Sequence, residues 1–357
     1  MRIEDIDRNM KVASSLELED IVWFDVRKAP FEIYGLFEPQ SAAPFRRMPQ
    51  SVADAANAGI AQLNLNTAGG RIRFSTDSDV VALKSTAKSL PLMSHIARSG
   101  QSGFDLYCAF GDEKMNFKGS FRPATNYTDG FETYVDCSRD GKLLQCEINM
   151  PPYGNVDELY LGFRKGSTLD VGRKYPHLLP IVFLGSSITQ GGCVSRPGNA
   201  FVPMISRDLD TDVINLGFSG SCHGETALVD HIAGLPMSLF VCDYDHNASG
   251  PDQLRETHLP LYKRFRAAQP DTPVLFITKP DWINDPLAFE RRKVIFETCL
   301  YALGQGDENV YFLDGETLWN GVNKNDCTVD TCHPNDLGHY RMAQVIGEKI
   351  NSIIHIK

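Results

Sequence analysis

The sequence predicts two unlike domains: an all-β sandwich or jelly roll over residues 1–170, and a doubly wound parallel α/β domain over residues 178–357. Three observations support this. The chain has 357 residues, more than a single hydrophobic core usually serves. Short apolar or alternating runs fill the first half, whereas the second half alternates apolar runs with longer segments of helical period. The change falls near residues 166–177, a polar stretch that contains glycines.

In the first domain, apolar or alternating runs separated by Gly, Asn, Asp and Pro predict strands. Runs of this kind at this spacing are typical of antiparallel sandwiches. No convincing helical pattern occurs in this half, so we expect strands and loops only. The predicted strands are residues 21–26, 59–66, 71–78, 80–86, 104–110, 131–137, 143–150 and 158–164.

The second domain shows five strand and helix units in succession. Such repetition predicts a five-stranded parallel sheet with helices on both faces. The predicted strands are residues 178–185, 212–218, 239–244, 273–279 and 310–315. The predicted helices are residues 199–209, 225–234, 253–268, 287–304 and 335–352.

Composition excludes several classes of partner. The formal net charge is -10 and no Lys/Arg cluster stands out, which argues against nucleic acid or an anionic membrane as partner. The first ten residues lack the apolar core of a secretory signal, and no run is long enough for a membrane helix. Nine cysteines without a C-x-x-C pair suggest free thiols. We therefore expect a cytoplasmic protein.

The first strand of the second domain ends in a candidate nucleophile. Ligands bind beyond the carboxyl ends of strands in open parallel sheets, and here the strand runs into GSSIT, residues 185–189. A serine at such a strand-to-helix turn presents its hydroxyl close to backbone N–H groups and the positive helix end. Taken alone, the segment would equally suit a helix cap. A phosphate-binding loop is disfavoured because no GK[ST] follows.

The ends of the next two strands carry possible donors. Glycines in NLGFSG, residues 215–220, allow a backbone N–H to approach a ligand closely. Asn247 in DYDHNA offers an uncharged amide, which suits a site where negative charge develops only in the transition state. Asp243, Asp245 and His246 could instead suggest metal ligands, but no second cluster with metal spacing accompanies them.

A candidate base precedes the last helix, in Asp330-Thr331-Cys332-His333. A histidine activates a serine only if its other ring nitrogen is held in the right tautomer, and a carboxylate three residues earlier can reach back to do this. A helix cap or a surface histidine is the alternative for this segment alone.

Together these four blocks, in this order and on these strand ends, resemble those of SGNH (GDSL-like) hydrolases. The resemblance implies a flavodoxin-like SGNH hydrolase fold without a cofactor or metal. It also implies Ser187 as nucleophile, His333 and Asp330 as the rest of the triad, and an oxyanion hole formed by Ser187, Gly220 and Asn247. Upstream, GFDLY at residues 103–107 is similar to the GxDLY signature of a β-rich domain that precedes some SGNH esterases.

Two blocks depart from the family pattern. GSS replaces the usual GDS, and DYDHN replaces GxND, which leaves open whether His246 also lines the pocket. An α/β-hydrolase is disfavoured because Ser187 lacks a G-x-S-x-G context and follows the first strand of its domain.

The resemblance implies a carboxylic ester hydrolase that removes a small acyl group, with an acetylated carbohydrate as the favoured substrate. The expected partner is a small-molecule or oligosaccharide ester, and a homo-oligomer is allowed. The alternatives are a lysophospholipase, thioesterase or acyltransferase of the same family, or a glycan-binding protein without turnover. Trp282, Tyr244 and Trp319 could stack on sugar or simply pack in the core.

Overall fold

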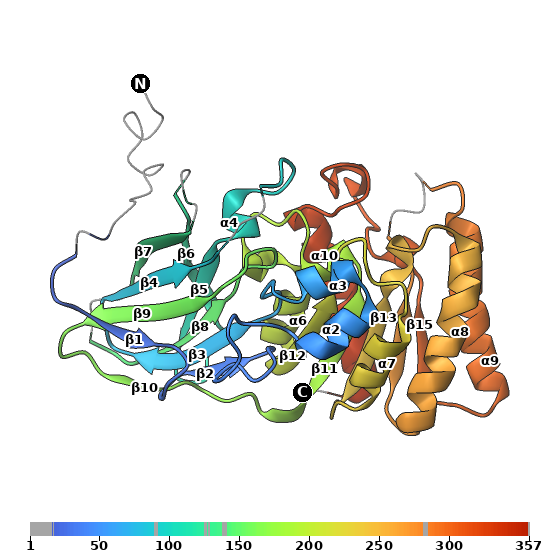
Figure 1. Ribbon diagram of the computed structural model, residues 1–357, viewed down its shortest axis with the longest axis horizontal. Helices are drawn as coiled ribbons and strands as arrows, with labels where there is room; N and C mark the ends of the chain where they lie inside the picture. The colour runs from blue at the N-terminus through green and yellow to red at the C-terminus, as the bar shows by residue number, and fades with distance from the viewer. Residues whose placement is uncertain are drawn as a thin grey trace. The chain divides into compact units, whose positions relative to one another are not determined.

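The computed structural model describes residue 16 and residues 18–88, 92–124, 127, 129–137, 141–280 and 285–355. These residues form two compact units (Figure 1). Of the described residues, the first contains those up to residue 46, those within 65–174 and residues 195–197. The second contains residues 47–64, residues 175–194 and the described residues from 198 onward. Sequence analysis placed residues 47–64 in the first domain, whereas in the structure they belong to the second unit.

The first unit is built from two antiparallel sheets, as predicted. One has the strand order β1 (Ile21–Asp25), β9 (Glu158–Arg164), β4 (Val80–Thr86) and β7 (Gly130–Asp136). The other has the order β10 (Leu169–Val171), β3 (Arg71–Thr76), β8 (Leu144–Asn149), β5 (Phe104–Phe110) and β6 (Asn116–Phe121), with β2 (Glu32–Tyr34) paired to β3.

One core lies between these two sheets. Leu83 and Leu161 from the first sheet and Phe74, Leu106 and Ile148 from the second belong to one buried cluster. Side chains alternate between the faces of a strand, so each sheet contributes one apolar face to this core. The prediction missed β2, β6 and β10, which are short or largely exposed and lack a clear apolar pattern.

The strand predicted at residues 59–66 is wrong, and so is the expectation that this half lacks helices. Helices α2 (Gln50–Ala56) and α3 (Ala58–Leu63) occupy this region, and α4 (Arg98–Gln101) follows later. The Asn57 side chain accepts a hydrogen bond from the Ile60 N–H and so caps α3. Ile60 is fully buried in the core of the second unit, which accounts for the helix more than local pattern does.

The second unit contains the predicted five-stranded parallel sheet. Its order is β12 (Thr211–Gly217), β11 (His177–Gly185), β13 (Leu239–Asp243), β14 (Val274–Ile277) and β15 (Val310–Leu313). This flavodoxin-like order confirms the expected doubly wound fold. Because β11 lies between β12 and β13, the strand order reverses there, and a crevice is expected beyond its carboxyl end.

Helices cover both faces of this sheet. One buried cluster joins the sheet to α7 (Thr226–Ala233), α8 (Pro251–Ala268) and α9 (Ala288–Gly304), and it includes residues of α2 and α3. The other cluster joins the sheet to α6 (Phe201–Leu209) and α10 (Asp336–Ile354). Along β11, Val182 and Leu184 face the first cluster and Ile181 and Phe183 the second.

Within the described part of the chain, no helix combines the length and the apolar character needed to cross a membrane. The nine cysteines all lie in this part, and no disulfide joins them. Eight are buried and Cys332 is half-buried.

Candidate active site

The structure brings the three predicted triad residues together in one hydrogen-bonded line. Ser187 begins the short helix α5 (Ser187–Gln190) directly after β11. Its Oγ lies 2.8 Å from His333 Nε2, and His333 Nδ1 lies 2.7 Å from Asp330 Oδ2. The chain separation between Ser187 and His333 is 146 residues, so the sheet topology creates this contact. This arrangement is the one that a serine nucleophile, a base and an orienting carboxylate require.

A tight turn places Asp330 and His333. The backbone N–H groups of Cys332 and His333 both donate to Asp330 Oδ1, at 3.1 and 2.7 Å. Thr331, between Asp330 and Cys332, has a positive φ of 68°, an uncommon conformation for a β-branched residue. The turn leaves Asp330 Oδ2 for the imidazole, so local backbone geometry directs the carboxylate at the His333 ring.

These hydrogen bonds also set the charge state of Asp330. Partial burial alone would raise the pKa of its carboxyl, but the hydrogen bonds from the His333 backbone and imidazole outweigh this, and the pKa is lowered. Asp330 is therefore ionised near neutral pH, with its carboxylate against the His333 ring.

The nucleophile turn depends on a close approach at Gly185. The Ser186 side chain caps α5 by accepting from the Ile188 N–H, and the Thr189 hydroxyl donates to Asp243 Oδ1. A Cβ on Gly185 would lie only 1.8 Å from that carboxylate oxygen and 2.1 Å from Thr189 Oγ1. The residue before Ser186 must therefore be glycine for the Thr189–Asp243 hydrogen bond to form across the turn.

The loop after β12 is fastened to the same helix. Asn215 donates from Nδ2 to the Thr189 carbonyl at 2.7 Å, and the Ser219 N–H donates to Gln190 Oε1 at 3.0 Å. These contacts position residues 218–222, which contain Gly220, beside the nucleophile helix. We refer to residues 218–222 as the oxyanion loop.

The two remaining predicted oxyanion donors, Gly220 and Asn247, lie together in the structure. The Gly220 N–H donates to Asn247 Oδ1 at 3.0 Å. Asn247 Nδ2 donates to the carbonyls of Phe218 and Cys222 at 2.9 and 3.1 Å. Asn247 thus holds the oxyanion loop through three hydrogen bonds. Its role as an oxyanion donor stays a prediction.

Sequence reasoning missed two residues that contact this loop from the 47–64 segment. Arg47 is 2% exposed; its guanidinium lies 4.2 Å from the centroid of the Phe218 ring and donates to the carbonyls of Asn215 and Gly217. Asn57 Nδ2 donates to the Ser221 carbonyl at 2.9 Å. Nothing in the local sequence signals these roles, because both contacts span more than 160 residues.

His246, in the third block that departs from the family pattern, lies beside the triad. Its Nδ1 is 3.7 Å from Sγ of Cys332, the residue before His333. Burial lowers the pKa of the His246 imidazole well below its usual range, and the charges of Lys279, His333 and Arg291 lower it further. His246 is therefore neutral.

Asp243 and Asp245, the carboxylates that could suggest a metal site in the sequence, have hydrogen-bond partners within the protein. Asp243 Oδ1 accepts from Thr189, and burial raises the pKa of this carboxyl well above its usual range. Asp245 Oδ2 accepts from the Lys279 N–H at 2.9 Å. Across the described residues, no group of three or more His, Cys, Asp and Glu side chains is placed to hold a metal ion.

Two of the aromatic residues considered for sugar stacking are buried. Tyr244 is 1% and Trp319 is 7% exposed, so these rings pack in the protein core. Trp282 lies outside the described residues.

Comparisons with known proteins place this geometry in context. Residues 179–351 match the model of the GDSL-like lipase/acylhydrolase family, and residues 21–169 match that of the N-terminus of SGNH-hydrolase-type esterases, named GxDLY. No curated protein matches the sequence.

Solved structures share the fold over nearly the whole chain. A protein described as a GDSL-like lipase from Bacteroides ovatus is 25% identical, with a TM-score of 0.85 over 94% of this chain and 99% of that one. The salicylyl-acyltransferase SsfX3 of a tetracycline biosynthetic pathway is 17% identical, with a TM-score of 0.75 over 96% and 100%. A family two carbohydrate esterase from Cellvibrio japonicus is 13% identical, with a TM-score of 0.57 over 94% and 98%.

Proposed function

Because this chain belongs to the GDSL-like lipase/acylhydrolase family of SGNH hydrolases, we propose that it is a serine esterase that releases acetate from an acetylated carbohydrate. The observation that carries the proposal is the hydrogen-bonded line from Ser187 Oγ through the His333 ring to Asp330. Ser187 is 7% exposed, so the attacking hydroxyl sits in a largely desolvated position, where electrostatic interactions are strong.

The chemistry is acyl transfer in two steps. His333 Nε2 accepts the Ser187 proton as Oγ attacks the ester carbonyl, and Asp330 stabilises the imidazolium. The imidazolium then protonates the departing sugar oxygen, which leaves as a hydroxyl, and an acetyl group remains on Ser187. A water molecule attacks this acyl-enzyme while His333 accepts its proton, and the same proton returns to Ser187 Oγ as acetate departs.

The oxyanion formed in both steps needs donors at the rim of the sheet. The Ser187 N–H at the start of α5 and the Gly220 and Asn247 groups of the neighbouring loops are our candidates. Asn247 Oδ1 already accepts from the Gly220 N–H, so an oxyanion that uses this N–H must share it or displace Asn247.

Support for a carbohydrate substrate comes from structures with the same fold. Several of them are family two carbohydrate esterases, and one from Clostridium thermocellum was solved in complex with cellohexaose. We expect a small acyl group to be preferred over a long chain, as for a sugar acetylesterase. The preference separates this proposal from a lysophospholipase or a thioesterase.

A second candidate is acyl transfer to a hydroxyl other than water. The fold shared with a salicylyl-acyltransferase favours it, since the same acyl-enzyme would serve both reactions. Adding an alcohol acceptor to the assay discriminates the two. Acetate release that falls as a new ester forms would identify a transferase.

The proposal is tested with Ser187→Ala and with Ser249→Ala as a matched control. Ser249 is an exposed serine two residues after Asn247. We expect hydrolysis of p-nitrophenyl acetate and acetate release from acetylated xylan, mannan and oligosaccharides to be lost only in Ser187→Ala. A fluorophosphonate should label the wild type and Ser249→Ala but not Ser187→Ala. Undiminished turnover by Ser187→Ala would refute the esterase assignment.

A further inference from the structure

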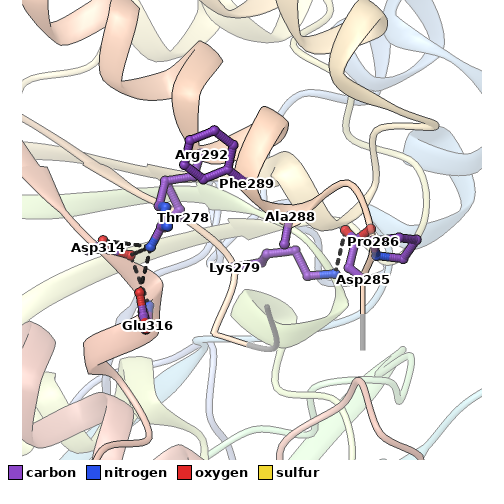
Figure 2. Close-up of a pocket in the computed structure, with 9 residues that line it drawn as sticks. All are labelled: Thr278, Lys279, Asp285, Pro286, Ala288, Phe289, Arg292, Asp314 and Glu316. Atoms are coloured by element: carbon purple, nitrogen blue, oxygen red, sulfur yellow. Dashed lines mark hydrogen bonds and ion pairs between the residues drawn. The ribbon is translucent and has the colours of Figure 1, made fainter. Parts of the chain in front are cut away.

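A cavity of about 280 Å³ lies at the carboxyl ends of β14 and β15 (Figure 2). This is the sheet edge at which ligands bind in open α/β folds. Its volume is just below the range of about 300–1,000 Å³ that drug-sized ligands occupy, so it suits one small ring. The residues that give it chemical character are Lys279, Asp285, Phe289, Arg292, Asp314 and Glu316.

The charged side chains that line the cavity are already paired with one another. Lys279 Nζ lies 3.0 Å from Asp285 Oδ2, and Arg292 Nη1 lies 3.0 Å from Asp314 Oδ2 and 2.7 Å from Glu316 Oε2. The lining has two cations and three carboxylates, and the third carboxylate is balanced by Arg291, whose Nε lies 3.1 Å from Asp285 Oδ2. An anionic ligand therefore finds no uncompensated positive charge, and a hydrocarbon would desolvate all five charges.

The cavity lining can form hydrogen bonds but does not attract anions. It therefore suits a neutral ligand rich in hydroxyl groups. Carboxylates accept from hydroxyl donors, and ammonium and guanidinium groups donate to hydroxyl oxygens. Such a ligand can bridge both ion pairs without separating them.

Phe289 adds an apolar surface to this polar lining. It lies in the first turn of α9 with 64% of its side chain exposed, and the Arg292 guanidinium carbon lies 5.7 Å from the centroid of its ring. Figure 2 shows both side chains at the same end of the cavity. An aromatic face next to paired charges matches a pyranose ring, which has C–H groups on its faces and hydroxyl groups around its edge.

The cavity lies on the same edge as the triad and at a fixed spacing from it. β14 is two strands and β15 three strands away from β11, which Ser187 follows, so the separation across the sheet is about 10–14 Å. The hydrogen bond from the Lys279 N–H to Asp245 connects the cavity lining to the segment that holds His246 and Asn247.

We propose that this cavity is a subsite for a neutral sugar ring of the substrate, removed from the acetylated ring that Ser187 attacks. The inference rests on the proposed function and adds to it. It assigns the sugar part of the substrate to the β14 and β15 end of the sheet, and it selects neutral oligosaccharides over uronic acid polymers.

The kinetic test compares a short and a long substrate in Phe289→Ala. p-Nitrophenyl acetate does not span about 10 Å, so its kcat/KM should stay as in the wild type. The KM for an acetylated xylo- or manno-oligosaccharide should rise roughly 3- to 10-fold with kcat unchanged, because the stacking surface is lost. Glu316→Gln should also raise this KM. Leu300→Ala, on the same helix and 51% exposed, is the control and should change neither substrate.

A binding measurement tests the subsite without relying on enzymatic turnover. Titration calorimetry of the full chain with unacetylated xylo-, manno- and gluco-hexasaccharides and with hexagalacturonate should show binding of at least one neutral sugar. That binding should weaken 3- to 10-fold in Phe289→Ala. Tighter binding of hexagalacturonate, or neutral binding unaltered in Phe289→Ala, would overturn the subsite.

The two proposals fail in different ways. If the wild type hydrolyses p-nitrophenyl acetate but releases acetate from no acetylated sugar, the carbohydrate esterase function fails. If it deacetylates sugars and Phe289→Ala does so with the same KM, only the subsite fails.

Discussion

The Gly220 N–H donates to Asn247 Oδ1 at 3.0 Å, so two groups expected to receive the oxyanion are bound to each other. Asn247 Nδ2 reaches two carbonyls of the same loop. The carboxamide therefore has a structural role as well as its proposed catalytic one. The two roles can be separated by measuring both the free energy of unfolding and kcat of a variant.

Asn247→Ala should lower kcat by about 10²- to 10³-fold with KM little changed, because an oxyanion donor is removed. It should also lower the free energy of unfolding by about 1–3 kcal/mol, because the carbonyls of Phe218 and Cys222 lose a donor. Steady-state kinetics and urea denaturation measure the two effects. An unchanged free energy of unfolding would show that the carboxamide does not hold the oxyanion loop.

Arg47→Met should destabilise the protein by about 2–5 kcal/mol and lower kcat. The substitution removes the donor to the carbonyls of Asn215, Gly217 and Leu63, and unsatisfied buried acceptors are costly. The neighbouring Arg46→Met is the control, since the side-chain hydrogen bonds described for Arg46 reach only the nearby carbonyls of residues 43 and 44. Equal stability of the two variants in urea denaturation would contradict the role assigned to Arg47.

Gly185→Ala should reduce kcat/KM by at least about tenfold and destabilise the fold by about 1–3 kcal/mol. The new methyl group would overlap Asp243 and Thr189 in a close-packed region, so the nucleophile turn must shift. Gly304→Ala at the end of α9 is the control, because its Cβ would meet no atom within 4 Å. Full activity of Gly185→Ala in the p-nitrophenyl acetate assay would count against this account of the turn.

Acid should destabilise the protein through buried histidines. Burial lowers the pKa of His258 to about 3 and that of His339 to about 4. Below about pH 6.5 the unfolded chain binds protons at these residues and the folded chain does not, so stability falls as the pH decreases toward the folded values. Each histidine should contribute about 1.4 kcal/mol per pH unit in this window.

The measurement is urea denaturation at pH 7.5 and 5.5 for the wild type and His258→Gln. The variant should lose less stability between the two pH values by about 1.4 kcal/mol. A pH dependence identical to that of the wild type would show that His258 titrates normally in the folded protein.

Local pattern predicted most of the architecture. The ranges of β4, β5 and β9 match the predicted strands residue for residue, because alternation and turn residues define strands locally. The parallel sheet followed from the succession of apolar runs and helical segments. The segment at residues 59–66 resisted prediction because its helix is short and depends on the cap from Asn57 and on packing against distant residues.

Some residues of the candidate site could be predicted from the sequence and others could not. Ser187, Asp330 and His333 lie in short motifs at strand ends, so sequence analysis could nominate them and the sheet topology brings them together. Arg47 could not be nominated, since its partners next to the oxyanion loop, Asn215 and Gly217, are about 170 residues away. The hydrogen bond between Gly220 and Asn247 was equally hidden, because orientation of a carboxamide is decided by neighbours in space.

The insertion of residues 47–64 into the second unit limits how the protein can be divided. A fragment that starts at residue 175 would keep the whole triad and the parallel sheet but lose α2, α3 and the buried Arg47. Recombining the N-terminal half with that of a relative would likewise replace part of the catalytic scaffold. The halves are therefore not interchangeable modules, and any exchange must retain residues 47–64 with the hydrolase sheet.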